Sequence, residues 1–156
     1  MKTLCVFFLS AIPLFLSCNN ESEPQDTPLP EKITANITYE LSGGENITDL
    51  FGINVTWTDA TGSQAQETVT VLPWEKTVSV DSIPFTATMS VTYSGKSDYP
   101  DKSAYKVGMG GGISYRTSAG NFGSASVAST ITVSNDRIAA YIQEKAKTVE
   151  YSTEIK

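Results

Sequence analysis

The stretch ITANITYEL, residues 33–41, alternates apolar and polar side chains with a period of two. Successive side chains of a β-strand point to opposite faces of its sheet, so this period is typical of a strand that is buried on one face only. The apolar row consists of Ile33, Ala35, Ile37, Tyr39 and Leu41, and the polar row between them of Thr34, Asn36, Thr38 and Glu40. We therefore expect residues 33–41 to form a strand that lies with one face against a hydrophobic core.

The same pattern recurs along the chain. Apolar residues alternate with Thr, Ser and Asn over residues 53–57, and again over residues 85–93, where the apolar row ends at Tyr93. Shorter strands are expected over residues 67–72, 76–80 and 124–133, with Gly- and Asp-containing turns between strands. This spacing indicates an all-β fold, an antiparallel β-sandwich of the immunoglobulin-like or transthyretin-like kind. Residues 32–156 suffice for one such domain.

One segment departs from the period of two. After Ser134 or Asn135, apolar residues recur at helical spacing, which predicts one short C-terminal helix that begins with a capping side chain. The apolar face of this helix contains Ile138, Ala139, Tyr141, Ile142 and Ala146. Alternation then resumes with Val149, Tyr151 and Ile155, so we expect a final strand.

The N-terminus has the pattern of a bacterial lipoprotein signal peptide. Lys2 supplies the positive charge, residues 4–16 form a short apolar run, and Ser17 is the small residue before Cys18. The run is shorter than the roughly 20 apolar residues of a membrane-spanning helix. We expect residues 1–17 to be removed and Cys18 to carry the lipid that holds the protein to a membrane, with ordinary secretion as the alternative.

Residues 18–31 are rich in Pro, Ser, Asn and acidic residues, which predicts a disordered tether behind the lipid. Glu21, Glu23 and Asp26 resemble the acidic stretch that directs lipoproteins of Bacteroidetes-type bacteria to the outer face of the outer membrane. The alternative is a solvated spacer in which these charges have no role. The sequence therefore predicts a location in the cell envelope, anchored to the outer membrane and facing either the periplasm or the surface.

Composition excludes several classes of function. The chain has 11 basic and 17 acidic residues, and loss of residues 1–17 would remove one base and no acid. Such an acidic protein lacks the basic patch with which a nucleic-acid binder neutralises phosphates. The chain has no histidine, and its two cysteines are Cys5 and Cys18, so the usual catalytic bases and metal ligands are missing from the predicted domain. We expect no enzymatic activity and no cofactor.

Residues 106–117 form an unusual predicted strand, because Gly108, Gly110 and Gly112 would leave one of its faces bare. A dinucleotide-binding loop is excluded, since such a glycine motif must open a helix and strand-forming residues follow here. The glycines indicate either a packing or bulge role, in which another segment approaches this backbone, or a surface for a partner. Trp74 is a further candidate for that partner surface.

Two loops contain weaker candidate sites. Asp98 and Asp101 offer hard oxygen ligands of the kind that calcium prefers, but two carboxylates are few for calcium, and the favoured alternative is a polar turn built around Pro100. Ser82 follows Asp81 and precedes Ile83, and this triplet resembles an O-glycosylation acceptor of Bacteroidetes-type bacteria. A plain turn is the alternative for Ser82.

Several short motifs in the first half of the predicted domain resemble the extracytoplasmic domain of the mycobacterial small membrane protein family, MmpS. They include residues 39–43 (YELSG), 56–59 (TWTD) and 72–78 (LPWEKTV). The resemblance implies an antiparallel sandwich outside the cytoplasm, without catalysis, that assists a membrane complex. The chain departs from the family in residues 129–134, which lack its late disulfide cysteine.

We therefore expect a non-catalytic cell-envelope lipoprotein that acts as a binding or accessory module for an envelope protein. One alternative is a structural subunit of an adhesin or fimbria, which would pair strands between molecules through an unprotected edge. The other is a carbohydrate-binding surface module, which would gather Trp74, Tyr99 or Tyr105 on one exposed surface.

Overall fold

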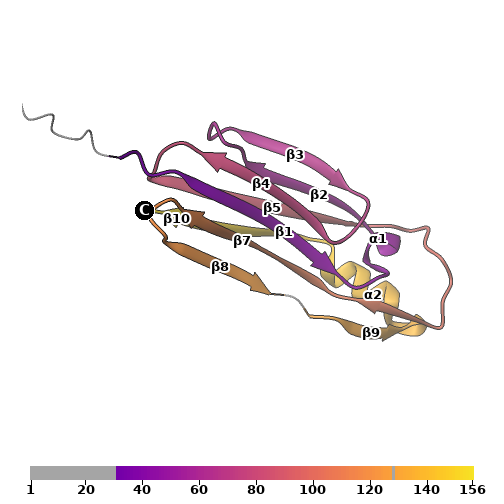
Figure 1. The fold of residues 1–156 in the computed structure, drawn as a ribbon. Helices are drawn as coiled ribbons and strands as arrows, with labels where there is room; N and C mark the ends of the chain where they lie inside the picture. The colour runs from indigo at the N-terminus through magenta and orange to yellow at the C-terminus, as the bar shows by residue number, and fades with distance from the viewer. Residues whose placement is uncertain (1–30, 128) are drawn as a thin grey trace, which may run out of the picture. The chain divides into compact units, whose positions relative to one another are not determined.

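The alternating rows of the sequence form the inner faces of two antiparallel sheets in the computed structural model, which describes residues 31–127 and 129–156 (Figure 1). In sheet A the strand order is β4-β1-β7-β8, and in sheet B it is β10-β5-β2-β3. The strands of sheet A are β1 (Ala35–Gly43), β4 (Trp74–Val80), β7 (Met109–Thr117) and β8 (Phe122–Val127). Those of sheet B are β2 (Phe51–Thr58), β3 (Gln64–Val69), β5 (Phe85–Gly95) and β10 (Thr148–Ile155). The predicted all-β antiparallel sandwich is confirmed.

A small third sheet and two helices complete the described part of the chain. The third sheet pairs β6 (Ala104–Val107) with β9 (Ile131–Ser134). Helix α1 (Ile47–Leu50) is a single turn, and α2 (Asn135–Lys145) is the predicted C-terminal helix. Its N-cap is Ser134, but within the described residues the expected capping hydrogen bond to a side chain is not formed. Both helices lie at the same end of the sandwich (Figure 1). Ile138 and Ile142 are one helical turn apart and bury the inner face of α2.

The hydrophobic core is the space between the two sheets. Its residues run from Ala35 to Ile155, so residues 32–156 contain a complete core and form a compact unit by themselves. Tyr39 of β1 is fully buried in this space. Its hydroxyl donates a 2.7 Å hydrogen bond to the backbone carbonyl oxygen of Thr58. This bond connects β1, a central strand of sheet A, with β2, a central strand of sheet B.

The structure corrects the expected strands at three places. Residues 106–117 do not form one strand, because the chain leaves the third sheet after Val107 and enters sheet A at Met109. Residues 124–133 are likewise divided between β8, which pairs with β7, and β9, which pairs with β6. The third correction is β3, which covers Gln64–Val69 and therefore begins and ends three residues earlier than the predicted strand 67–72. Its early start follows from the tight turn in which Asp59 accepts backbone hydrogen bonds from Thr61 and Ser63.

Helix α1 was not predicted, since a single turn leaves no helical period in the sequence. The side chain of Asn46 holds it in place: it accepts a 2.9 Å hydrogen bond from the backbone of Lys106 and donates a 3.2 Å bond to Asp49. Within the ranges described above, neither helix has the length and apolarity that a bilayer crossing requires.

Replacement of Tyr39 with Phe tests the bond between the sheets. The variant keeps the aromatic ring but leaves the buried carbonyl oxygen of Thr58 without its donor, which costs about 1–3 kcal/mol. We expect urea unfolding at pH 7 to show a loss of this size. Tyr115→Phe is the matched control, because Tyr115 is half-buried on β7 and its hydroxyl makes no hydrogen bond among the described residues.

Alkaline pH provides a second readout of the same variant. Burial raises the pKa of Tyr39 to about 12, from 10.0 for an ordinary tyrosine. The unfolded chain therefore loses this proton first, and the stabilising effect of the protonated tyrosine disappears as the pH rises from 10 towards 12. Tyr39→Phe should lose less free energy of unfolding than the parent over that interval. If the parent and Tyr39→Phe lost the same free energy of unfolding between pH 10 and pH 12, the raised pKa would not belong to Tyr39.

Candidate functional site

Gly108 is buried where the chain passes between the third sheet and sheet A. A Cβ atom at this position would overlap the backbone carbonyl oxygen of Ser129, which crosses directly over it. The backbone of residue 129 can approach this closely only because Gly108 has no side chain. Gly108 therefore has a packing role, one of the two alternatives for the glycine run. Gly110 and Gly112 are also buried, within β7 opposite Ser42 and Glu40.

Trp74 closes one lateral side of the sandwich, between the edge strands β4 and β3. Its ring packs against Trp57 of sheet B with 5.6 Å between ring centroids. Lys76 points inward from the same edge, 5.3 Å above the Trp57 ring and 4.0 Å from the carboxylate of Glu67 on β3. Trp74 and Gly111 also line one shallow groove of about 270 Å³, so the structure brings Trp74 and the glycine strand together.

The loop that contains Asp98 and Asp101 is held by side-chain contacts. Asp101 accepts a 2.9 Å hydrogen bond from the side chain of Asn135 at the start of α2, and Asp98 is exposed. Lys102, the residue after Asp101, forms a 2.9 Å ion pair with Asp49 of α1. The hydrogen bond from Lys102 is the main reason that the pKa of Asp49 is lowered. In residues 31–127 and 129–156, no three acidic or metal-binding side chains gather at one point.

The remaining predicted positions are distributed over the molecule. Ser82 is exposed in the loop between β4 and β5, where an enzyme can reach it. Cys18 and the expected signal peptide lie outside the described residues, as does the tether up to residue 30. The three aromatic residues expected to form a sugar-binding platform do not share one exposed surface. Tyr105 is fully buried, with its hydroxyl bonded to the carbonyl of Pro100, and Tyr99 packs against it.

The opposite lateral side of the sandwich contains a groove that the sequence analysis did not identify. We name it the tyrosine groove and define it by Tyr93, Met109, Ile131, Tyr141, Val149 and Tyr151. It has a volume of about 320 Å³ and lies between sheet B, β7, the start of β9 and α2. A second cavity of about 530 Å³, under α2, shares Ile131, Tyr141 and Lys145 with it. The two cavities are therefore adjacent and together fall within the range of small-molecule sites.

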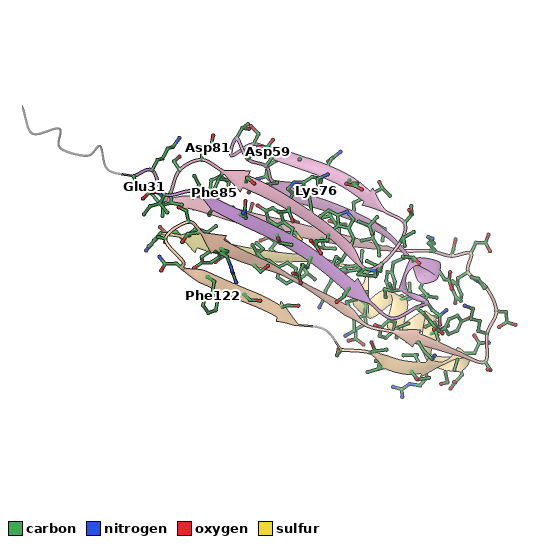
Figure 2. The ribbon with its side chains drawn as sticks, in the orientation of Figure 1. Glu31, Asp59, Lys76, Asp81, Phe85 and Phe122 are labelled. Carbon is green, nitrogen blue, oxygen red and sulfur yellow. The ribbon has the colours of Figure 1, made fainter. Side chains whose placement is uncertain are left out.

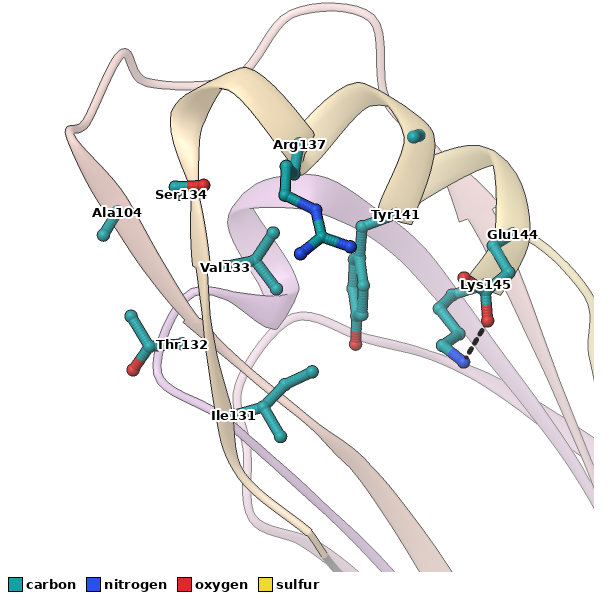
Figure 3. Close-up of a pocket in the computed structure, with 10 residues that line it drawn as sticks. Ala104, Ile131, Thr132, Val133, Ser134, Arg137, Tyr141, Glu144 and Lys145 are labelled. Carbon is teal, nitrogen blue, oxygen red and sulfur yellow. Dashed lines mark hydrogen bonds and ion pairs between the residues drawn. The ribbon is translucent and has the colours of Figure 1, made fainter.

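Helix α2 provides one wall of this site. Arg137, Tyr141 and Lys145 are spaced four residues apart, so they project from one face of the helix. Figure 3 shows all three side chains extending into the space between α2 and β9, towards Ile131 and Val133. Glu144 lies beside them and pairs with Lys145 at 2.6 Å. Lys147, just after the helix, lines the tyrosine groove.

The three tyrosine hydroxyls of the groove remain protonated at neutral pH. Desolvation by burial raises the pKa of Tyr93, and the neighbouring Tyr151 and Tyr141 raise it further. Burial also raises the pKa of Tyr141 and that of Tyr151. The hydrogen bond to Glu144 raises the pKa of Lys145, which therefore keeps its positive charge. The groove thus presents neutral hydroxyl donors next to permanent cations.

Part of this site was predictable from the sequence. Tyr93, Tyr141 and Tyr151 all appear in the predicted apolar rows, so their inward orientation was expected. Their gathering was not expected, because the three residues belong to different elements, and the position of the Tyr151 hydroxyl also uses space at Gly111. A Cβ at this glycine would lie 3.1 Å from the hydroxyl of Tyr151, so its missing side chain leaves the room that this hydroxyl occupies.

No protein-family model and no curated protein matches this chain. The fold is an antiparallel β-sandwich with a groove on one lateral side. The resemblance to the mycobacterial small membrane protein family remains a prediction from the motifs.

Proposed function

We propose that this protein is a non-catalytic cell-envelope lipoprotein, held by lipid at Cys18, which acts as a binding module through the tyrosine groove. The envelope location and the lipid rest on the signal-like N-terminus and on the acidic, polar tether. Absence of histidine from the sequence, with no cysteine after Cys18, supports binding rather than catalysis. An accessory role within a membrane complex is consistent with the MmpS-like motifs.

The observation that carries the proposal is a tyrosine hydroxyl inside the groove that has no partner among the described residues. Tyr93 is only 3% exposed, yet its hydroxyl makes no hydrogen bond to any described residue. Fully enclosed polar side-chain atoms of the described residues all have partners, so this hydroxyl opens onto the cavity. At the mouth, Ile131 is 50% exposed despite being a large apolar residue. A ligand in the groove would cover the exposed side chain of Ile131 and accept a hydrogen bond from the hydroxyl of Tyr93.

Blocking the groove tests this function. Ile131→Trp should fill the shared opening of the two cavities and weaken binding of the neutral apolar dye Nile red to residues 32–156 by at least about fivefold. Val71→Trp is the matched control, since Val71 is 72% exposed and does not line the groove. Exposed positions tolerate substitution within about 0.5 kcal/mol, so both variants should fold.

The readout is dye fluorescence in titrations of the parent and the two variants. The expected pattern is a saturable signal in the parent and in Val71→Trp, with reduced affinity in Ile131→Trp alone. Equal dye affinity in all three proteins would place the dye elsewhere and contradict the assignment of the groove.

A specific observation favours a second candidate, a structural subunit that pairs strands between molecules. Sheets A and B each have two edge strands, and three of these four strands contain charged residues. The charged residues are Glu75 and Lys76 in β4, Glu67 in β3, and Glu150 and Glu154 in β10. Charges on an edge oppose unwanted pairing. The fourth edge strand, β8, reads FGSASV and has none. Phe122 on β8 is 77% exposed and extends away from the body (Figure 2).

The occupant that this edge fits is a second copy of β8. A two-fold pair of identical neutral strands brings no like charges together, although the chain as a whole is acidic. Ser124→Lys should abolish the concentration-dependent dimer measured by sedimentation velocity, while Ser152→Lys on the charged edge strand β10 should leave it unchanged. A parent protein that stays monomeric at all concentrations would exclude this second candidate.

A further inference from the structure

The tyrosine groove combines three hydroxyl donors with a positively charged rim. Tyr93, Tyr141 and Tyr151 contribute the donors, and no described residue accepts a hydrogen bond from any of their hydroxyls. These hydroxyls open onto the cavity and are free to donate to an acceptor that enters it. Burial raises the pKa of all three tyrosines, so each hydroxyl keeps the proton that it can donate to an oxygen of a ligand.

The charges next to the groove favour an anion. Arg137, Lys145 and Lys147 line the two adjacent cavities, and Glu144 is the one acidic residue that lines them. Glu144 is paired with Lys145, whereas Arg137 and Lys147 form no ion pair with any described residue. This is a net positive surface on a protein whose net charge is −6. A negatively charged ligand is attracted to such a site and held more strongly as it leaves water.

The remaining walls are apolar. Met109 and Val149 are partly buried against the core, and Ile131 and Val133 line the outer cavity under α2. An inorganic anion would leave these side chains uncovered. A ligand with a hydrocarbon tail would cover them, at about 25 cal/mol per Å² of apolar surface removed from water.

We propose that the tyrosine groove binds a small anionic amphiphile, a carboxylate with an unbranched hydrocarbon tail. The carboxylate oxygens accept hydrogen bonds from Tyr93 and its neighbouring tyrosines and face Lys145. The tail lies over Ile131 and Val133 in the outer cavity. This inference rests on the proposed function, since it assigns a ligand class to the same groove.

Calorimetric titration of residues 32–156 with three probes tests the ligand class. Decanoate has both the charge and the tail, 1-decanol keeps the tail without the charge, and acetate keeps the charge without the tail. We expect decanoate to bind at least tenfold more tightly than 1-decanol, and acetate to show no measurable binding. Equal affinity for decanoate and 1-decanol would overturn the anion assignment while leaving the groove as a binding site. Failure of both long-chain probes to bind would overturn the inference and the proposed function together.

Two substitutions test the assigned contacts. Tyr93→Phe removes only the hydroxyl, and a lost hydrogen bond to a charged group should weaken decanoate binding roughly tenfold or more. Lys145→Gln should weaken decanoate binding and reduce its dependence on salt, without changing 1-decanol binding. Tyr115→Phe is the control, since Tyr115 does not line either cavity. Unfolding midpoints establish that each variant is folded. Unchanged decanoate affinity in folded Tyr93→Phe and Lys145→Gln would overturn the proposal.

Discussion

The hydrogen bond from the Tyr39 hydroxyl to the carbonyl oxygen of Thr58 joins the two sheets, from the middle of β1 to the end of β2. It fixes β1 and β2 relative to each other at this point, because the buried hydroxyl has a single acceptor. All other strands of the sheets are placed by pairing outward from this connected pair. The two lateral sides of the sandwich then have to be closed by the edge strands and their side chains.

The two sides are closed in different ways, and this difference produces the candidate site. On one side, Trp74 packs on Trp57 and Lys76 lies over the Trp57 ring, which fills the space between β4 and β3. On the other side, Gly111 has no side chain to fill the space above Tyr151, and the chain crosses at Ser129 rather than adding a strand. Tyrosine rings line that opening, and α2 contributes Tyr141 and Lys145 to its border. The result is a groove with apolar walls, hydroxyl donors and cations.

Much of the fold follows from local sequence. The alternating rows of residues 33–41 and 85–93 predict strands because a one-residue shift would turn every apolar side chain to solvent. The helix of Ile138 and Ile142 is predictable for the same kind of reason, with a period of 3.6. The breaks at Gly108 and after Val127 are not, since they depend on one segment crossing another that is 21 residues away in sequence. The glycine pattern indicates that some segment can approach this backbone, but it does not say which segment does so.

The site shows the same division. The sequence identified the glycine strand and Trp74 as unusual, and the structure makes Gly108 a packing position and Trp74 part of a closed side. The inward orientation of Tyr93, Tyr141 and Tyr151 was predictable, but the lack of partners for their hydroxyls requires three-dimensional distances. The positive charge of the site was not predictable from composition either, because the chain as a whole is acidic. Only the fold brings Arg137, Lys145 and Lys147 to the two adjacent cavities.

The central claim is that ligand binds between these tyrosines. Fluorine NMR of residues 32–156, labelled with 3-fluorotyrosine and titrated with decanoate, tests it most directly, because each tyrosine gives its own signal. The account predicts that the signals of Tyr93, Tyr141 and Tyr151 shift together and saturate at one equivalent, while those of Tyr39 and Tyr105 stay in place. Saturable shifts confined to Tyr115 or Tyr99, or no saturable shift at any tyrosine, would contradict it.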